Sequence, residues 1–151
     1  MRYWLVKSEP DEYSIDDLAR DQTGVWDGVR NYQARNYLKE MNKGDLLLFY
    51  HSSCRPQAVA GIAKVIRTAE PDPTQFDPRN ERYDPGSAPA NPRWFQVAIA
   101  FVQKFAEALT LEEIKRIPAL KNMVLLKRGR LSVQPVSPDE WAVVLKAKNQ
   151  G

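Results

Sequence analysis

The chain has 151 residues, of which 43% are hydrophobic and 27% charged, which is typical of one globular domain with a buried core. A single cysteine, Cys54, excludes an internal disulfide, and one histidine, His51, leaves too few ligands for a zinc site without carboxylates. The formal net charge of +3 is compatible with an anionic partner but does not require one.

Targeting signals and common catalytic motifs are missing from the sequence. The segment from Met1 to Lys7 has no apolar stretch of the signal-peptide kind, and no apolar run reaches the length of a membrane span. We therefore expect a cytoplasmic protein without a membrane partner. The chain lacks a Walker loop, a G-x-S-x-G motif and an H-E-x-x-H motif, which argues against an enzyme and against any cofactor or required metal.

The first third of the chain predicts two strands with two short helices between them. Residues 2–7 carry the alternation of a strand, and Ser14 is a good N-cap for a helix that ends near Arg20. Asn31 can cap a second helix, because apolar residues recur after it at helical spacing. Residues 45–50 then form a run of apolar residues that predicts a buried strand.

A Pro-rich segment separates the next two predicted strands, which span residues 58–67 and 95–101. Six of the eleven prolines lie in residues 70–93. We expect a long surface loop there and not a linker between domains, because the strand that follows alternates strongly.

The last third of the chain predicts a helix, a strand and a final helix. Thr110 begins a capping box, residues 131–136 form a strand, and Ser137 precedes a helix with proline at its first position. Strands and helices follow one another without regular βαβ alternation. We therefore predict a single α+β domain over residues 1–151, with a mixed, mostly antiparallel sheet curled toward a barrel and short peripheral helices.

Three segments combine aromatic, small polar and arginine residues near the ends of strands: residues 3–10, residues 25–36, and residues 49–52 together with 129–135. A flat ring flanked by guanidinium and amide groups suits a nucleobase, which stacks on the ring while polar groups read its edge.

Each of these residue types also has a structural interpretation. Tryptophans such as Trp4, Trp94 and Trp141 commonly fill a core, whereas Trp26 lies in a polar, Gly-flanked segment where core and pocket remain equal alternatives. Arg30 and Arg35 are five residues apart across a helix start, so they need not share a face, and each is as consistent with a solvated surface arginine as with a phosphate contact.

The same segments resemble the EVE domain family. The resemblance rests on Tyr3-Trp4-Leu5 with Lys7-Ser8-Glu9-Pro10, on Trp26 to Asn31 with Gln33-Ala34-Arg35-Asn36, on Gly44-Asp45 with Phe49-Tyr50-His51-Ser52, and on Arg130 to Val136. It spans nearly the whole chain and includes Pro71-Asp72-Pro73-Thr74 in the long loop.

This resemblance implies a PUA-like pseudo-barrel that binds nucleic acid and accepts a modified base, with cytosine derivatives in DNA as the main substrate class and RNA as an alternative. It also implies a set of site residues. Those expected around the base are Tyr3, Lys7, Ser8, Trp26, Arg30, Asn31, Tyr50, Ser52 and Ser132, and those expected at the backbone are Arg35 and Arg130.

Two other functions remain open at the level of sequence. The first is a nuclease, hydrolase or deaminase acting on nucleotides, for which Glu9, Asp27 and Asp45 are the candidate acids. The second is a protein-interaction domain that binds no nucleic acid. Salt dependence separates this second alternative from a nucleic-acid-binding module, because phosphate contacts weaken steeply as salt rises.

Overall fold

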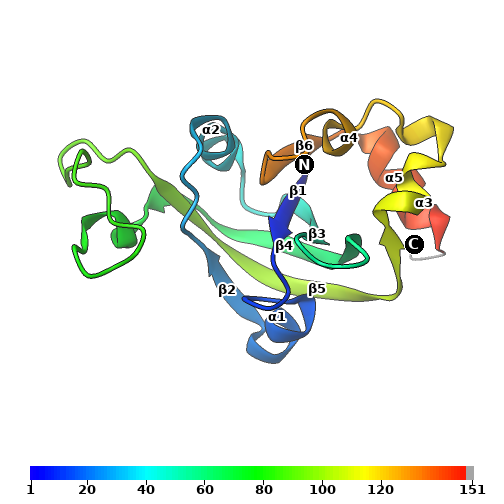
Figure 1. Cartoon of the computed structure of the whole chain (residues 1–151), viewed down its shortest axis with the longest axis horizontal. Helices are drawn as coiled ribbons and strands as arrows, with labels where there is room; N and C mark the ends of the chain where they lie inside the picture. The colour runs from blue at the N-terminus through cyan, green and yellow to red at the C-terminus, as the bar shows by residue number, and fades with distance from the viewer. Residues whose placement is uncertain (149–151) are drawn as a thin grey trace.

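The computed structural model describes residues 1–148 and is built on one six-stranded sheet with helices packed on both faces (Figure 1). The strands are β1 (Tyr3–Ser8), β2 (Thr23–Trp26), β3 (Leu46–His51), β4 (Ala58–Pro71), β5 (Phe95–Thr110) and β6 (Val133–Val136). The helices are α1 (Ile15–Asp21), α2 (Tyr32–Glu40), α3 (Leu111–Lys115), α4 (Val124–Lys127) and α5 (Pro138–Ala147), with short 3₁₀ turns at Pro73–Phe76 and Pro118–Leu120. None of the helices in this part of the chain is long and apolar enough to cross a membrane.

The sheet is mixed and mostly antiparallel, as the sequence predicts. Its strand order is β2-β5-β4-β3-β1-β6, in which only the β1–β3 pair is parallel. The strands β2 and β6 are therefore the two edges of an open order. The Pro-rich loop leaves the sheet between β4 and β5 and forms a projection at one end, while α3 and α5 lie at the other (Figure 1).

The long pair formed by β4 and β5 gives the sheet its curvature. Its register shifts at four points, and such bulges bend a strand and increase its twist. One shift begins at Gly61, where an added Cβ would lie only 2.3 Å from the carbonyl oxygen of Gln103. A glycine is needed at this position because the backbones of the two strands approach too closely for a side chain.

Two cores lie on opposite faces of the central strands. Along β1 and β3, Trp4 and Phe49 point into a core shared with α1 and α2, whereas Leu5 and Leu48 point into a second core covered by α3, α4 and α5. Alternation of side chains across the pleat explains the division. Burial on both faces also explains why residues 45–50 appear in the sequence as an almost continuous apolar run.

The structure differs from the prediction at several elements. The strand β4 continues to Pro71 and does not end at residue 67. Residues 23–26 form the strand β2, which the sequence analysis treated as loop because the segment is short and polar. The strand β5 continues to Thr110 and does not end at residue 101, since bulges interrupt the alternation that marks its first half. The short helix α4 was not predicted, because four residues carry too little periodicity to be recognised.

We predict that Leu48→Ala lowers the free energy of unfolding by about 2–5 kcal/mol, because it leaves a cavity at a fully buried position between β3 and the C-terminal helices. Urea unfolding followed by circular dichroism measures the change. The control Val102→Ala, at a side chain that is 44% exposed on β5, should cost less than about 1 kcal/mol. Equal losses for the two variants would contradict the assignment of the second core.

Candidate functional site

A cavity of about 770 Å³ opens where the two edges of the sheet approach each other. This volume lies within the range of about 300–1,000 Å³ that is usual for small-molecule sites. One wall comes from β2, and the opposite wall comes from the end of β1 and the segment before β6. The residues around the cavity are Lys7, Ser8, Glu9, Glu12, Tyr13, Asp21, Thr23, Gly24, Val25, Trp26, Asp27, Gly28, Ser52, Ser53, Gln57, Arg82, Ile99, Gly129, Arg130 and Ser132.

Trp26 provides a large aromatic surface on the β2 side. Its indole is partly exposed and meets the ring of Phe49 edge to face, with ring centroids 5.6 Å apart. The core therefore supports one side of the indole and leaves another part of it on the cavity wall. Trp26 therefore combines the two alternatives that the sequence left open, because it packs against the core and also lines the cavity.

Tyr13 adds a second ring to the cavity. Its hydroxyl lies near Gly24, and Gly24 shares a face of β2 with Trp26 because side chains alternate along a strand. The hydroxyl donates to Asp21 at 2.9 Å. Burial and the neighbouring Asp21 carboxylate raise the pKa of Tyr13 to about 12, so the phenol stays neutral at physiological pH. The cavity therefore offers two neutral rings.

Basic groups lie on the opposite rim. Lys7, near the end of β1, reaches across and donates to the carbonyl of Gly129, which holds the turn that carries Arg130. Partial burial lowers the pKa of Lys7. The backbone of the same turn is fixed to β1 by a hydrogen bond of 2.9 Å from the amide of Lys7 to the carbonyl of Ser132. This rim places positive charge at the mouth of the cavity.

Acidic residues of the cavity are Glu9, Glu12, Asp21 and Asp27. Burial raises the pKa of Asp27, and the nearby carboxylate of Asp72 raises it further. Within residues 1–148, no group of three or more histidine, cysteine or acidic side chains is arranged to hold a metal ion. Asp45, the third acid considered for catalysis, is buried elsewhere and accepts hydrogen bonds from the Trp4 indole and two backbone amides.

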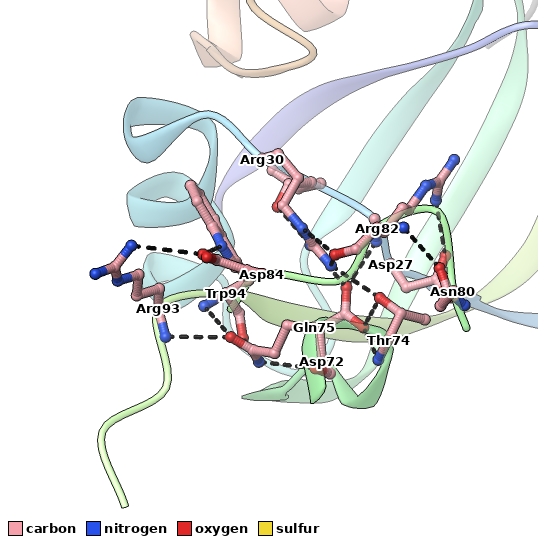
Figure 2. A network of polar contacts seen from close by, with 12 residues as sticks. Asp27, Arg30, Asp72, Thr74, Gln75, Asn80, Arg82, Asp84, Arg93 and Trp94 are labelled. Carbon is pink, nitrogen blue, oxygen red and sulfur yellow. Dashed lines mark hydrogen bonds and ion pairs between the residues drawn. The ribbon is translucent and has the colours of Figure 1, made fainter. Parts of the chain in front are cut away.

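A buried carboxylate, Asp72, joins the Pro-rich loop to the cavity wall (Figure 2). It accepts hydrogen bonds from the amide of Gly28 at 2.8 Å, from the hydroxyl of Thr74 at 2.6 Å and from Arg30 at 3.2 Å. Burial alone would raise the pKa of Asp72, but these donors together hold it below its ordinary value. The carboxylate is therefore charged and fully paired.

Arg30 in turn fixes Arg82 at the cavity. Its Nε and Nη2 atoms donate to the Arg82 carbonyl at 3.2 and 2.8 Å, and its guanidinium lies over the ring of Trp94. The side chain of Arg82 then crosses Gly28, where an added Cβ would lie 1.6 Å from Nη1. Gly28 also has a φ of 73°, so both conformation and space require glycine there.

A second buried side chain, Gln75, holds the remainder of the loop. Its amide nitrogen donates to the carbonyls of Asp72 and Trp94, and its oxygen accepts from the amide of Trp94 and the hydroxyl of Ser87. Asp84 accepts from the Trp94 indole at 2.7 Å (Figure 2). The prolines therefore lie in a loop with its own internal packing, which is the usual condition for a long loop that carries function.

Six of the residues expected from the sequence lie around this cavity: Lys7, Ser8, Trp26, Ser52, Arg130 and Ser132. The hydroxyl of Ser8 donates to the carbonyl of Tyr13 at 2.5 Å, so it positions the second ring.

Five expected residues lie elsewhere, and each has a structural partner. Tyr3 stacks on Trp141 with centroids 4.5 Å apart, and Tyr50 is buried with its hydroxyl on Gln57. Asn31 accepts from the amide of Ala34 as the cap of α2. The two arginines, Arg30 and Arg35, donate to the loop carbonyls of Arg82 and Arg93. None of these five side chains lines the cavity.

The sequence analysis missed Tyr13, Gln57 and Arg82. The ring of Tyr13 lies in the turn before α1, and Arg82 lies in the middle of the Pro-rich loop, so neither is adjacent to a recognisable strand end. A signal in the sequence was Gly28, two residues after Trp26, since a glycine can mark the close approach of another segment.

A curled, mostly antiparallel sheet with a lateral cavity between its edges defines this protein as a PUA-like α+β domain. The family model described as the EVE domain matches residues 2–147, and the chain belongs to that family.

Similar proteins extend over almost the whole chain. Human thymocyte nuclear protein 1 is 41% identical over 167 residues, which cover 98% of this chain and 74% of the relative. A hypothetical protein from Leishmania major has a TM-score of 0.95 at 45% identity, with coverage of 99% of this chain and 96% of the other. The structure of the human THYN1 protein in complex with DNA containing 5-methylcytosine has a TM-score of 0.95 at 40% identity, with coverage of 100% and 99%.

We predict that Asp72→Asn destabilises the protein by about 3 kcal/mol at pH 7, because it leaves Arg30 without its buried partner. The pKa of Asp72 is lowered in the folded state, so its contribution is complete above the ordinary value of 3.8 and disappears as pH falls below it. The difference between wild type and variant should therefore shrink below pH 3.8. Urea unfolding across pH tests this, with Glu81→Gln in the same loop as the control. A pH-independent difference would contradict the assignment.

Proposed function

We propose that this EVE domain binds DNA and holds one modified base of the 5-methylcytosine class in the cavity beside Trp26. The observation that carries the proposal is the partly exposed indole on the wall of a cavity large enough for a nucleotide base. The similar human THYN1 protein, whose structure is in complex with 5-methylcytosine-containing DNA, supports the choice of DNA and of this base. The same cavity admits a modified base in RNA, which is the second partner to test.

The energies of base extrusion and stacking are compatible with this function. Extruding a base from a duplex costs a few kcal/mol, and each stacked aromatic ring returns about 1–3 kcal/mol. Trp26 and Tyr13 together therefore offset most of the cost. Burial of a methyl group adds only about 0.8 kcal/mol, which is a few-fold in affinity. We expect modest selectivity between cytosine and 5-methylcytosine unless another contact reinforces it.

Three basic side chains around the cavity suit the phosphates on either side of an extruded nucleotide. Arg130 and Lys7 lie on the rim next to β6, and Arg82 lies on the side of the Pro-rich loop. A guanidinium pairs with phosphate through two parallel hydrogen bonds, so the two arginines are suited to fix the backbone while the rings hold the base.

We predict that Trp26→Ala weakens binding to an oligonucleotide with one 5-methylcytosine by about tenfold, because it removes a stacking surface worth about 1–3 kcal/mol. Fluorescence anisotropy with labelled DNA and RNA of the same sequence measures the affinities. Tyr83→Ala, at an aromatic side chain that is 40% exposed in the Pro-rich loop, is the control and should leave binding unchanged. Unchanged binding by Trp26→Ala would refute the base site, and preference for the RNA would reassign the partner.

We predict that Arg130→Ala weakens binding to methylated and unmethylated DNA by the same factor, because it removes a phosphate contact and no base contact. The slope of log affinity against log salt should fall in magnitude by about 1. Anisotropy titrations at several salt concentrations measure the slope. Arg116→Ala, at an exposed position after α3 at the far end of the sheet, is the control that should change neither quantity. An unchanged slope for Arg130→Ala would exclude Arg130 as a phosphate ligand.

A further inference from the structure

Asp27 is the acidic residue that immediately follows the aromatic wall. It comes directly after Trp26, at the point where β2 ends, and both residues line the cavity. Its side chain is 41% exposed, so it is open to a ligand but not fully surrounded by water. Asp27 therefore lies beside the indole on which a base would stack, where it can contact the edge of that base.

The pairing of Asp27 leaves room for a ligand. Its Oδ1 atom lies 3.7 Å from Nη1 of Arg82, which is longer than the 2.7–2.9 Å of a strong charge-assisted hydrogen bond. By contrast, Asp21, another acid of the cavity, accepts from Tyr13 and from Arg20, each at 2.9 Å. A carboxylate offers about four acceptor positions, so Asp27 retains capacity for further donors.

The surroundings of Asp27 make an additional hydrogen-bond donor to its carboxylate favourable. Burial raises the pKa of Asp27, and the charge of Asp72 behind the wall raises it further, while Arg82 opposes both effects. An amino group that donates to the carboxylate would replace a hydrogen bond to water that burial removes. Three of the four common bases, cytosine, adenine and guanine, carry an amino group on the edge that pairs in a duplex, whereas thymine carries none.

We propose that Asp27 reads the exocyclic amino group of the bound base and thereby selects cytosine-type bases over thymine-type bases. This inference rests on the proposed function, that is, on a base entering the cavity. 5-Methylcytosine and thymine are both pyrimidines with the same methyl group. They differ at position 4, which carries an amino donor or a carbonyl acceptor, and at N3, which carries a hydrogen only in thymine. An ionised carboxylate that faces position 4 accepts from the amino group of 5-methylcytosine and repels the carbonyl of thymine.

Arg82 acts here as a positioning residue. The Pro-rich loop places the guanidinium of Arg82 across Gly28 and near the Asp27 carboxylate. Arg30 fixes this position by donating two hydrogen bonds to the backbone carbonyl of Arg82. The positive charge favours the ionised form of Asp27 and restricts where its oxygens lie. The loop thus contributes to base selection through an arginine that contacts the acid.

The test compares two DNA duplexes that differ only in one base, which is 5-methylcytosine or thymine and lies opposite an abasic site in both. The abasic site removes the partner base, so extrusion costs nearly the same in each duplex. Wild type should prefer 5-methylcytosine by about tenfold, which is within the range for one discriminating base contact. Asp27→Asn supplies both an acceptor and a donor, so it should bind the two duplexes within about twofold of each other.

Glu81→Gln is the control, because it removes an exposed carboxylate of the Pro-rich loop that does not line the cavity and should keep the wild-type preference. Equal affinity of wild type for the two duplexes would overturn the inference and leave the base site intact. A preference that survives in Asp27→Asn, or that disappears in Glu81→Gln, would also overturn it. Failure of wild type to bind either duplex would instead refute the proposed function itself. The wild-type ratio needs no variant, so the test does not depend on how Asp27→Asn folds.

Discussion

The buried carboxylate of Asp72 is the constraint on which the site depends. It lies in the Pro-rich loop, yet it pairs with Arg30 before α2 and with the amide of Gly28 after β2. A charged group without access to water is stable only when donors surround it, so these segments must meet at one place. Their meeting fixes the end of β2, which carries Trp26, and sets the position from which Arg82 reaches the cavity. The loop is therefore a structural part of the cavity wall.

Curvature of the sheet is the second constraint. In the strand order, β2 and β6 are the most distant strands, but residues from β2 and from the segment before β6 line one cavity. Bulges along β4 and β5 permit this arrangement. The resulting cavity combines the rings of Trp26 and Tyr13 with basic groups, and two of its acids, Asp21 and Asp27, lie next to these rings. A uniformly basic groove would attract any nucleic acid, whereas mixed charge next to a ring is suited to distinguish one base from another.

The sequence predicted the fold more fully than the site. Alternation and capping signals located β1, β3, α1, α2 and α5, and the lack of βαβ order indicated the mixed sheet. Aromatic and arginine residues near strand ends indicated the edge of the sheet that carries the cavity. They did not separate Trp26, which lines the cavity, from Tyr50, which is buried, or from Tyr3, which stacks on Trp141. That distinction depends on which residues oppose each other across bulged strands. Arg82 could not be assigned because its approach depends on a loop held by tertiary hydrogen bonds.

The central claim is that one base of the bound DNA stacks on the indole of Trp26. Protein labelled with 5-fluorotryptophan gives one ¹⁹F signal for each of its four tryptophans, and a Trp26→Phe protein assigns the signal of Trp26. Titration with DNA containing 5-methylcytosine should shift the Trp26 signal strongly and leave those of the buried Trp4, Trp94 and Trp141 nearly unchanged. Saturated binding with an unshifted Trp26 signal would contradict the account.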